Sequence, residues 1–152
     1  MMVEMELDNL DKQILNTLIS NSRLSYRQIA PILKVSVATI MNRINKLQKE
    51  GIIKSFTTQI DYDKLDYDIH VIIDIRVAKG KLFQVENKIA NHPNVYAVYD
   101  TTGHFDATII AKFKNRRSMD AFLKKIQTYE FVERTETKLV LNTIKEERII
   151  LQ

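Results

Sequence analysis

Residues 36–51 read S-V-A-T-I-M-N-R-I-N-K-L-Q-K-E-G, and this stretch predicts a helix with a defined start and end. Ser36 is a good N-cap, because its hydroxyl can accept a hydrogen bond from the free amides of the first turn. Gly51 is a good stop, because glycine adopts the left-handed conformation that often ends a helix at little cost. The apolar residues recur every three or four positions and share one face: Val37, Ile40, Ile44 and Leu47.

The opposite face of this predicted helix is polar and basic, and it has no acid before Glu50. Such a face suits phosphates and base edges, although an ordinary amphipathic surface helix would show the same pattern. The segments before and after the helix are needed to distinguish these two interpretations. The polar residues are Thr39, Asn42, Arg43, Lys46 and Lys49.

Composition limits the possible functions of the 152-residue chain. It is 45% apolar, enough to bury a core, and carries a net charge of +4, a mild basic bias that is compatible with nucleic acid. The absence of cysteine excludes disulfides, thiolate catalysis and cysteine-ligated zinc. The three histidines have no metal-ligand spacing, so we expect neither a metal nor a cofactor. No apolar run is long enough for a membrane span and no secretory signal is present, so we expect a cytoplasmic protein.

An acidic octet divides the chain into two predicted domains. Residues 61–68, D-Y-D-K-L-D-Y-D, carry four acids against one lysine, whereas the segments on either side are basic. A calcium loop is excluded, because Leu65 stands where the third ligand belongs and the glycine at the sixth position is missing. We therefore predict a linker at 61–68, between a first domain at 1–60 and a second at 69–152.

Two further helices are expected before the basic helix. Asp8 can cap a helix that runs to about Asn21, and Ser25 can cap a shorter one that Pro31 kinks or shortens. Two short helices joined by a tight turn form a helix-turn-helix. Residues 52–60 are rich in β-branched and aromatic residues and predict a strand, or wing, after the basic helix. This arrangement favours DNA binding.

The second half has the pattern βαββαβ, which predicts a ferredoxin-like sheet with two helices on one face. The strands are expected at 69–78, 95–102, 105–113 and 131–142, and the first helix at 81–92. No third helix remains to cover the other face, to which the pattern assigns Ile72, either Tyr96 or Tyr99, and Ile109. A half-covered apolar sheet usually finds a partner, so we predict a homodimer through this face.

The order of these parts resembles the Lrp/AsnC family of bacterial and archaeal transcription regulators, also called feast/famine regulators. The similarity covers nearly the whole chain, and it is carried by short segments whose order and spacing are specific together. The segments include L-D-N-L-D-K-Q-I-L at 7–15, V-S-V-A-T-I-M-N-R-I-N-K-L at 35–47, G-I-I-K at 51–54, G-H-F-D at 103–106 and V-E-R-T-E-T-K-L-V-L at 132–141.

The resemblance implies an α+β protein: an N-terminal winged helix-turn-helix followed by a ferredoxin-like βαββαβ domain. It also implies dimers, often assembled into tetramers of dimers, and an amino-acid effector bound between the second domains. By position, the effector site would include Gly103 and Asp106 in a turn and Thr135 and Thr137 on the last strand. A carboxylate suits an α-amino group, while backbone amides and hydroxyls suit a carboxylate.

Double-stranded DNA is the expected partner of the first domain. Thr39 and Asn42 are predicted to reach base edges, and Ala38 a thymine methyl group. The other contacts are expected to reach the phosphate backbone: Arg43 and Lys46, the amides of the helix that begins after Ser36, Tyr26 and Arg27 from the preceding helix, and Lys54 from the wing.

Two alternatives compete with a DNA-binding regulator. Some proteins that resemble this family decarboxylate haem precursors, for which His70, His104 and Arg134 would be the candidate residues here. The sequence places none of them beside a partner, so we predict no enzyme activity. The other alternative is an amino-acid sensor that has lost DNA binding. A helix that no longer binds DNA would be free to gain acidic residues on its polar face. The polar face of the helix at 36–51 has stayed basic, which argues against this alternative.

Overall fold

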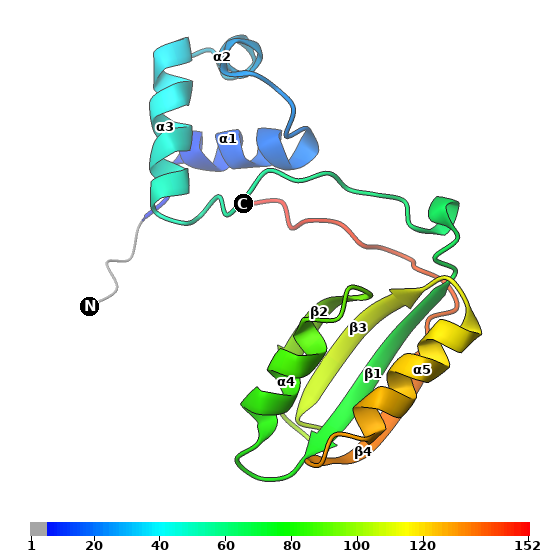
Figure 1. The fold of residues 1–152 in the computed structure, drawn as a ribbon. Coiled ribbons are helices and arrows are strands. Elements are labelled where there is room, and N and C mark those ends of the chain that lie inside the picture. The colour runs from blue at the N-terminus through cyan, green and yellow to red at the C-terminus, as the bar shows by residue number, and fades with distance from the viewer. Residues whose placement is uncertain (1–5) are drawn as a thin grey trace. The chain divides into compact units, whose positions relative to one another are not determined.

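The computed structural model describes residues 6–152, which form two compact units (Figure 1). The helix-turn-helix unit contains the residues up to Gln59 together with Lys145–Gln152, and the sheet unit contains Ile60–Ile144. Among the described residues, no helix is both long and apolar enough to cross a membrane.

Three helices build the helix-turn-helix unit: α1 (Asn9–Ser20), α2 (Tyr26–Leu33) and α3 (Val37–Lys49). The predicted N-caps are confirmed. Asp8 and Ser25 both form capping boxes, and the Ser36 hydroxyl accepts from the amide of Thr39. Helix α2, which contains Pro31, is short as predicted, with eight residues, and it ends at Lys34 in the left-handed conformation. A turn of three residues, 34–36, then leads into α3.

The core of this unit lies between the three helices. Ile40, Ile44 and Leu47 of α3 are at most 1% exposed and pack with residues of α1 and α2. Val37 is 42% exposed, so its predicted place on the buried face is wrong. It is the first residue of α3, directly after the turn 34–36, and the buried face begins only at Ile40. The predicted stop is confirmed, because Gly51 has φ +73° directly after the helix.

The strand predicted at 52–60 is not formed. Ile52 and Ile53 turn back, both donating to the carbonyl of Leu47, and residues 54–60 have no regular structure. A strand requires a ladder partner for its backbone groups, and alternation of side chains alone cannot supply one.

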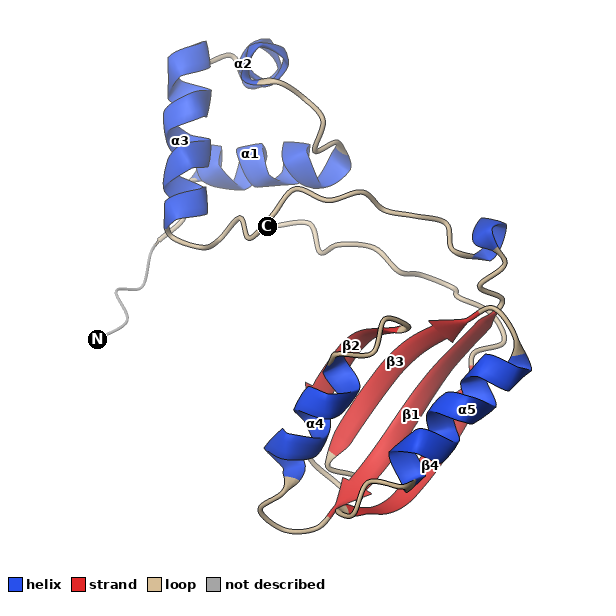
Figure 2. Cartoon of the chain, viewed as in Figure 1, coloured by secondary structure: helices blue, strands red, loops and turns tan. Residues whose placement is uncertain are grey.

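The sheet unit has the predicted ferredoxin-like fold. Its elements in chain order are β1 (Ile69–Val77), α4 (Leu82–Ala90), β2 (Val95–Asp100), β3 (Ala107–Phe113), α5 (Arg116–Gln127) and β4 (Val132–Leu139). All neighbouring strands are antiparallel, in the order β2-β3-β1-β4. Figure 2 shows both long helices of this unit on one face of the sheet.

The two faces of the sheet differ sharply. Under the helices, Ile73, Ile75, Ile109 and Phe113 are fully buried. The prediction that Ile109 lies on the open face is therefore wrong: it pairs with Ile73 and shares its side of the sheet. The register shifts by one residue between Val95 and Ala97, an irregularity that sequence alternation cannot reveal.

The open face carries Ile72 and Ile110, two tyrosines, and Asp74, whose carboxylate accepts hydrogen bonds from Thr108 and Lys138. Tyr96 lies near His70 on this face, with its hydroxyl 3.4 Å from Nε2 of the histidine. Tyr99, which pairs with Thr108, joins it there, and both tyrosines are more than half exposed. The sequence left open which of the two tyrosines faces this side, and the shift in register brings both onto it.

The acidic octet 61–68 lies within the sheet unit, where the sequence placed a separate linker. It forms a short 3₁₀ helix, η1 (Asp63–Leu65), between two tyrosines whose rings meet edge to face at 5.6 Å. Lys112 lies over the ring of Tyr62 and Lys114 over that of Tyr67. The residues from Lys145 onward, predicted as part of the second domain, group instead with the helix-turn-helix unit.

Candidate functional site: an exposed helix face and a strand-end turn

One face of α3 is exposed along the whole helix. Its exposed side chains fall three or four positions apart, so they lie on the side opposite the buried residues Ile40, Ile44 and Leu47. Two of the predicted base-reading residues, Ala38 and Asn42, are among them. The side chains on this face are Ala38, Met41, Asn42, Asn45, Lys46 and Lys49, and the exposed side chains of Val37 and Gln48 lie at its edge.

Sequence reasoning missed two members of this face. Asn45 lies between Asn42 and Lys49 along the same stripe, and Met41, 40% exposed, is adjacent. The helical spacing of both residues could have placed them on this face, but an apolar residue such as Met41 is not expected on a polar face. Asn45 can offer both a donor and an acceptor, as Asn42 does, and such amides suit an adenine edge.

The other predicted DNA contacts have different surroundings. Thr39 is half-buried, and its hydroxyl lies 2.8 Å from that of Ser36, so both side chains help to start the helix. Tyr26 packs partly against the core of the unit, whereas Arg27 is exposed one position later on α2. Lys54 is exposed in the irregular segment that replaces the predicted wing strand.

Arg43 points toward the unit's own acids. Its guanidinium donates to the carboxylates of Asp8, at 2.5 Å, and Asp11, at 3.1 Å. These acids begin α1, and the Asp11 side chain is only 5% exposed. The Asp11 backbone amide and the guanidinium of Arg43 together hold the pKa of Asp8 below its ordinary value. Arg43 thus ties α3 to the start of α1, a role that its predicted phosphate contact did not include.

The turn between β2 and β3 contains two of the four predicted effector residues. Gly103 has φ +114°, a conformation that favours glycine, so the turn depends on it. Asp106 joins β1 through two hydrogen bonds: its amide donates to the Ile75 carbonyl, and its carboxylate accepts from the Val77 amide at 2.7 Å. Asp106 therefore helps to attach the turn to the sheet.

The two predicted threonines lie on β4, on the helix-covered side of the sheet. Thr135 pairs with Ile75 and Thr137 with Ile73, so each shares the side of its buried partner. The side-chain nitrogen Nε2 of Gln127, at the end of α5, donates to the Thr135 hydroxyl at 3.3 Å. Asp106 and Thr135 therefore flank the same point of β1, which brings the turn and the last strand together.

A hollow of about 330 Å³ lies beside the turn, lined by Arg76, His104, Phe105, Arg134 and Glu136. The Arg134 guanidinium lies over the Phe105 ring. Two of the residues considered for decarboxylation, His104 and Arg134, thus share a surface. The third, His70, lies six positions before Arg76 along β1, or about 20 Å away, so the three do not form one site.

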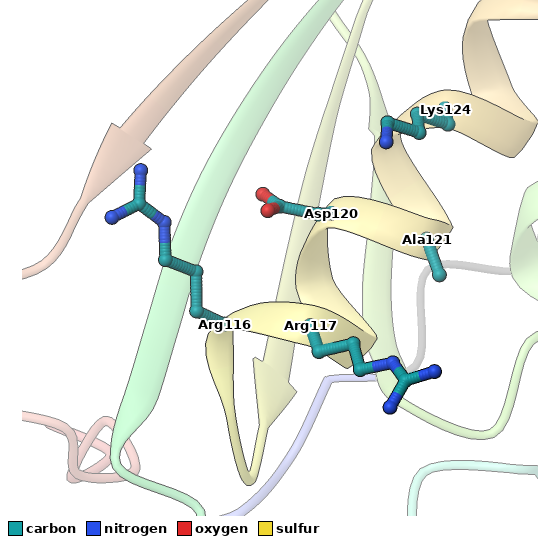
Figure 3. Close-up of a pocket in the computed structure, with 5 residues that line it drawn as sticks. All are labelled: Arg116, Arg117, Asp120, Ala121 and Lys124. Carbon is teal, nitrogen blue, oxygen red and sulfur yellow. The ribbon is translucent and has the colours of Figure 1, made fainter.

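A second shallow hollow lies on the outer side of α5 (Figure 3). Figure 3 shows the side chains of Arg116 and Arg117 extending in different directions from the first turn, with Asp120 one turn further on. This surface is charged and open, and it contains none of the residues that the sequence predicted to bind DNA or the effector. The lining residues are Arg116, Arg117, Asp120, Ala121 and Lys124.

Comparison with known protein families assigns both units. A winged helix-turn-helix DNA-binding model matches residues 7–54, and the model of the Lrp/AsnC ligand binding domain matches residues 70–150. The chain belongs to the Lrp/AsnC family. Together the two models cover most of this Lrp/AsnC chain and confirm the predicted fold class.

Related proteins are similar over nearly their full length. An HTH-type transcriptional regulator from Pyrococcus furiosus is 45% identical over 143 residues, which is 94% of this chain and 97% of the relative. The regulator FL11 from the same organism is 35% identical over 140 residues, 92% of this chain and 93% of that protein. The solved structure of AsnC from E. coli has a TM-score of 0.89 and 29% identity, with 96% of this chain and 99% of that one covered.

These similarities define the general activity. The relatives are named as transcription regulators, and the first unit matches a DNA-binding model. This Lrp/AsnC protein is therefore a DNA-binding transcription regulator, and the prediction that it is not an enzyme is confirmed.

Proposed function

We propose that this Lrp/AsnC regulator binds DNA as a dimer, with the exposed face of α3 in the major groove, and that an amino-acid effector modulates binding. The observation that carries the DNA contact is the composition of that face. It presents two amides and two lysines without an acid, while the opposite face of the helix is buried to 1% exposure or less. Amides read bases and lysines hold phosphates.

The residues of this face have separable roles. Asn42 and Asn45 supply sequence preference, because an amide can bond bidentately to adenine. Lys46 and Lys49, one turn further on, supply affinity through phosphate contacts that depend on salt. Arg27 on α2 extends the basic surface across the backbone of the duplex.

Fluorescence anisotropy against labelled operator DNA over a range of salt concentrations tests this assignment. For a dimer, Lys46→Ala removes two phosphate contacts, so the slope of log K against log[salt] should fall in magnitude by about 1.8. Thr17→Ala is the matched control, because Thr17 lies on α1 and its hydroxyl bonds within its own helix. An unchanged slope for Lys46→Ala would refute a phosphate contact by this residue.

The effector proposal rests on the sheet unit, which matches a ligand-binding domain model over residues 70–150. A regulator from Neisseria meningitidis with the same fold, 21% identical and with a TM-score of 0.87 over 97% of each chain, was solved in complex with L-Met. We propose that the ligand lies near the Gly103–Asp106 turn and the threonines of β4. Backbone amides of the turn and the hydroxyls of Thr135 and Thr137 would hold its carboxylate.

Calorimetric titration with the twenty amino acids, one at a time, tests the effector. The double change Thr135→Val and Thr137→Val keeps the shape of both side chains and removes both hydroxyls. It should abolish the heat of binding for any amino acid that binds the unaltered protein. If the heat is unchanged in this variant, these threonines are not ligands.

We propose that dimers form through the open face of the sheet. Tyr96 and Tyr99, each more than half exposed, lie on this face with the partly buried Ile72 and Ile110, and an apolar surface of this kind usually finds a partner. Light scattering during gel filtration should give the mass of a dimer, or of a tetramer of dimers. Replacing both tyrosines with glutamate should reduce the mass to that of one chain, and a persistent dimer would place the interface elsewhere.

A further inference from the structure

The end of the chain packs against the first helix of the helix-turn-helix unit. The Asn16 side chain makes two hydrogen bonds to the backbone of Leu151: its amide nitrogen donates to the carbonyl at 2.9 Å, and its oxygen accepts from the amide at 2.8 Å. The Leu151 side chain packs against the core that contains Ile14, Leu15 and Leu18. The C-terminus, marked C in Figure 1, is thus fixed to α1.

Leu151 is buried more than other apolar residues near the end of the chain. Ile144 is 93% exposed and Ile149 is 85% exposed, whereas Leu151 is half-buried on the core. Asn16 satisfies both backbone groups of the one residue whose side chain is inserted, as a neighbouring β-strand would. An asparagine amide offers a donor and an acceptor side by side, so it can do what an aspartate or a leucine at position 16 cannot.

This contact gives the sheet unit a second connection to the helix-turn-helix unit. The helix-turn-helix unit consists of the residues up to 59 and the segment 145–152, and the whole sheet unit lies between them in the sequence. The sheet unit is therefore connected to the DNA-reading unit twice, through the segment after α3 and through the segment after β4. Undocking of Leu151 would leave only the first connection.

We propose that residues 145–152 are a second tether, fastened by Asn16 and Leu151, that restricts how the helix-turn-helix unit moves relative to the sheet unit. In a dimer the tether raises the effective concentration of the second α3 at its half-site once the first has bound. This consequence for DNA rests on the proposed function, whereas the docking itself does not. The partner of the α1 surface is a defined segment of this chain.

Hydrogen–deuterium exchange of the full-length protein tests the docking without DNA. Asn16→Ala and Leu151→Ala alter opposite sides of the contact, and each should speed amide exchange in α1 and at Leu151 by about tenfold, the effect of losing one or two hydrogen bonds and their packing. Ile149→Ala is the matched control, because its side chain is exposed two positions away. Exchange that matches the control in both variants would overturn the proposal.

Binding of the same variants to operator DNA tests the consequence. Affinity for a two-half-site operator should fall at least about threefold in Asn16→Ala and Leu151→Ala, with affinity for a single half-site unchanged. Faster exchange with unchanged two-site affinity would refute the role as a tether. If the unaltered protein binds no DNA, the proposed function fails, and the exchange data still decide whether the segment docks.

Discussion

Replacing Arg43 with alanine should destabilise the helix-turn-helix unit. Arg43 joins α3 to two carboxylates at the start of α1, and the side chain of Asp11 is 5% exposed. Removing one partner of a fully buried ion pair costs about 3–5 kcal/mol, because the remaining charge is left unpaired. The Arg43 side chain is 33% exposed, so water screens part of this loss, and we expect about 2 kcal/mol.

Urea unfolding followed by circular dichroism measures this loss. With a slope of about 2 kcal/mol per molar, typical of small domains, the midpoint for the helical signal should fall by about 1 M. Lys46→Ala is the control, because Lys46 is exposed and surface changes usually stay within about 0.5 kcal/mol.

The double variant Asp11→Asn with Arg43→Ala should recover part of the loss, because no unpaired charge remains buried. A midpoint for Arg43→Ala that matches the Lys46→Ala control would refute this reasoning. In that case Arg43 would be free to contact phosphate, as the sequence alone suggested. Salt-dependent DNA binding by the folded fraction would then show a reduced slope.

Three further results are expected. Ile40→Ala, at a fully buried position under α3, should cost about 2–5 kcal/mol in urea unfolding, and a loss below about 1 kcal/mol would contradict the described core. Gly51→Ala should cost about 1–2 kcal/mol, because Gly51 has φ +73°, and calorimetry would show it as a lower melting temperature. Burial would raise the pKa of Asp74, but hydrogen bonds from Lys138 and Thr108 outweigh it and hold the pKa below its ordinary value. The stabilising effect of Asp74 should therefore be present above that value and be lost as the pH falls through the lowered pKa, and Asp74→Asn should flatten the acid limb of a stability–pH curve.

The helices of the first unit could be predicted because their signals are local. A cap and a stop lie within a few residues of the helix they define, and Ser25, Ser36 and Gly51 all act as expected. The role of Arg43 could not be predicted in this way. Its acidic partners lie 32 and 35 residues away in the sequence. Without the fold, a basic residue on a polar helix face is therefore interpreted as a DNA contact.

The sheet shows the same distinction. Hydrophobic alternation located all four strands, but the face of each residue in β2 depends on a one-residue shift in pairing with β3. No sequence pattern marks that shift, so the facing of Tyr96 and Tyr99 stayed open. The docking of Leu151 on Asn16 spans 135 residues and involves backbone groups, which carry no sequence signal.

Selection of bound sequences from a random double-stranded DNA pool tests the central claim, that the exposed face of α3 reads DNA. The unaltered protein should enrich a two-fold symmetric sequence with half-sites about one helical turn apart. Asn42→Ala should relax the preference at one position in each half-site, and Lys46→Ala should weaken binding to all sequences alike. Enrichment of the same sequence, with the same preference at every position, by Asn42→Ala and by Asn45→Ala would contradict the account.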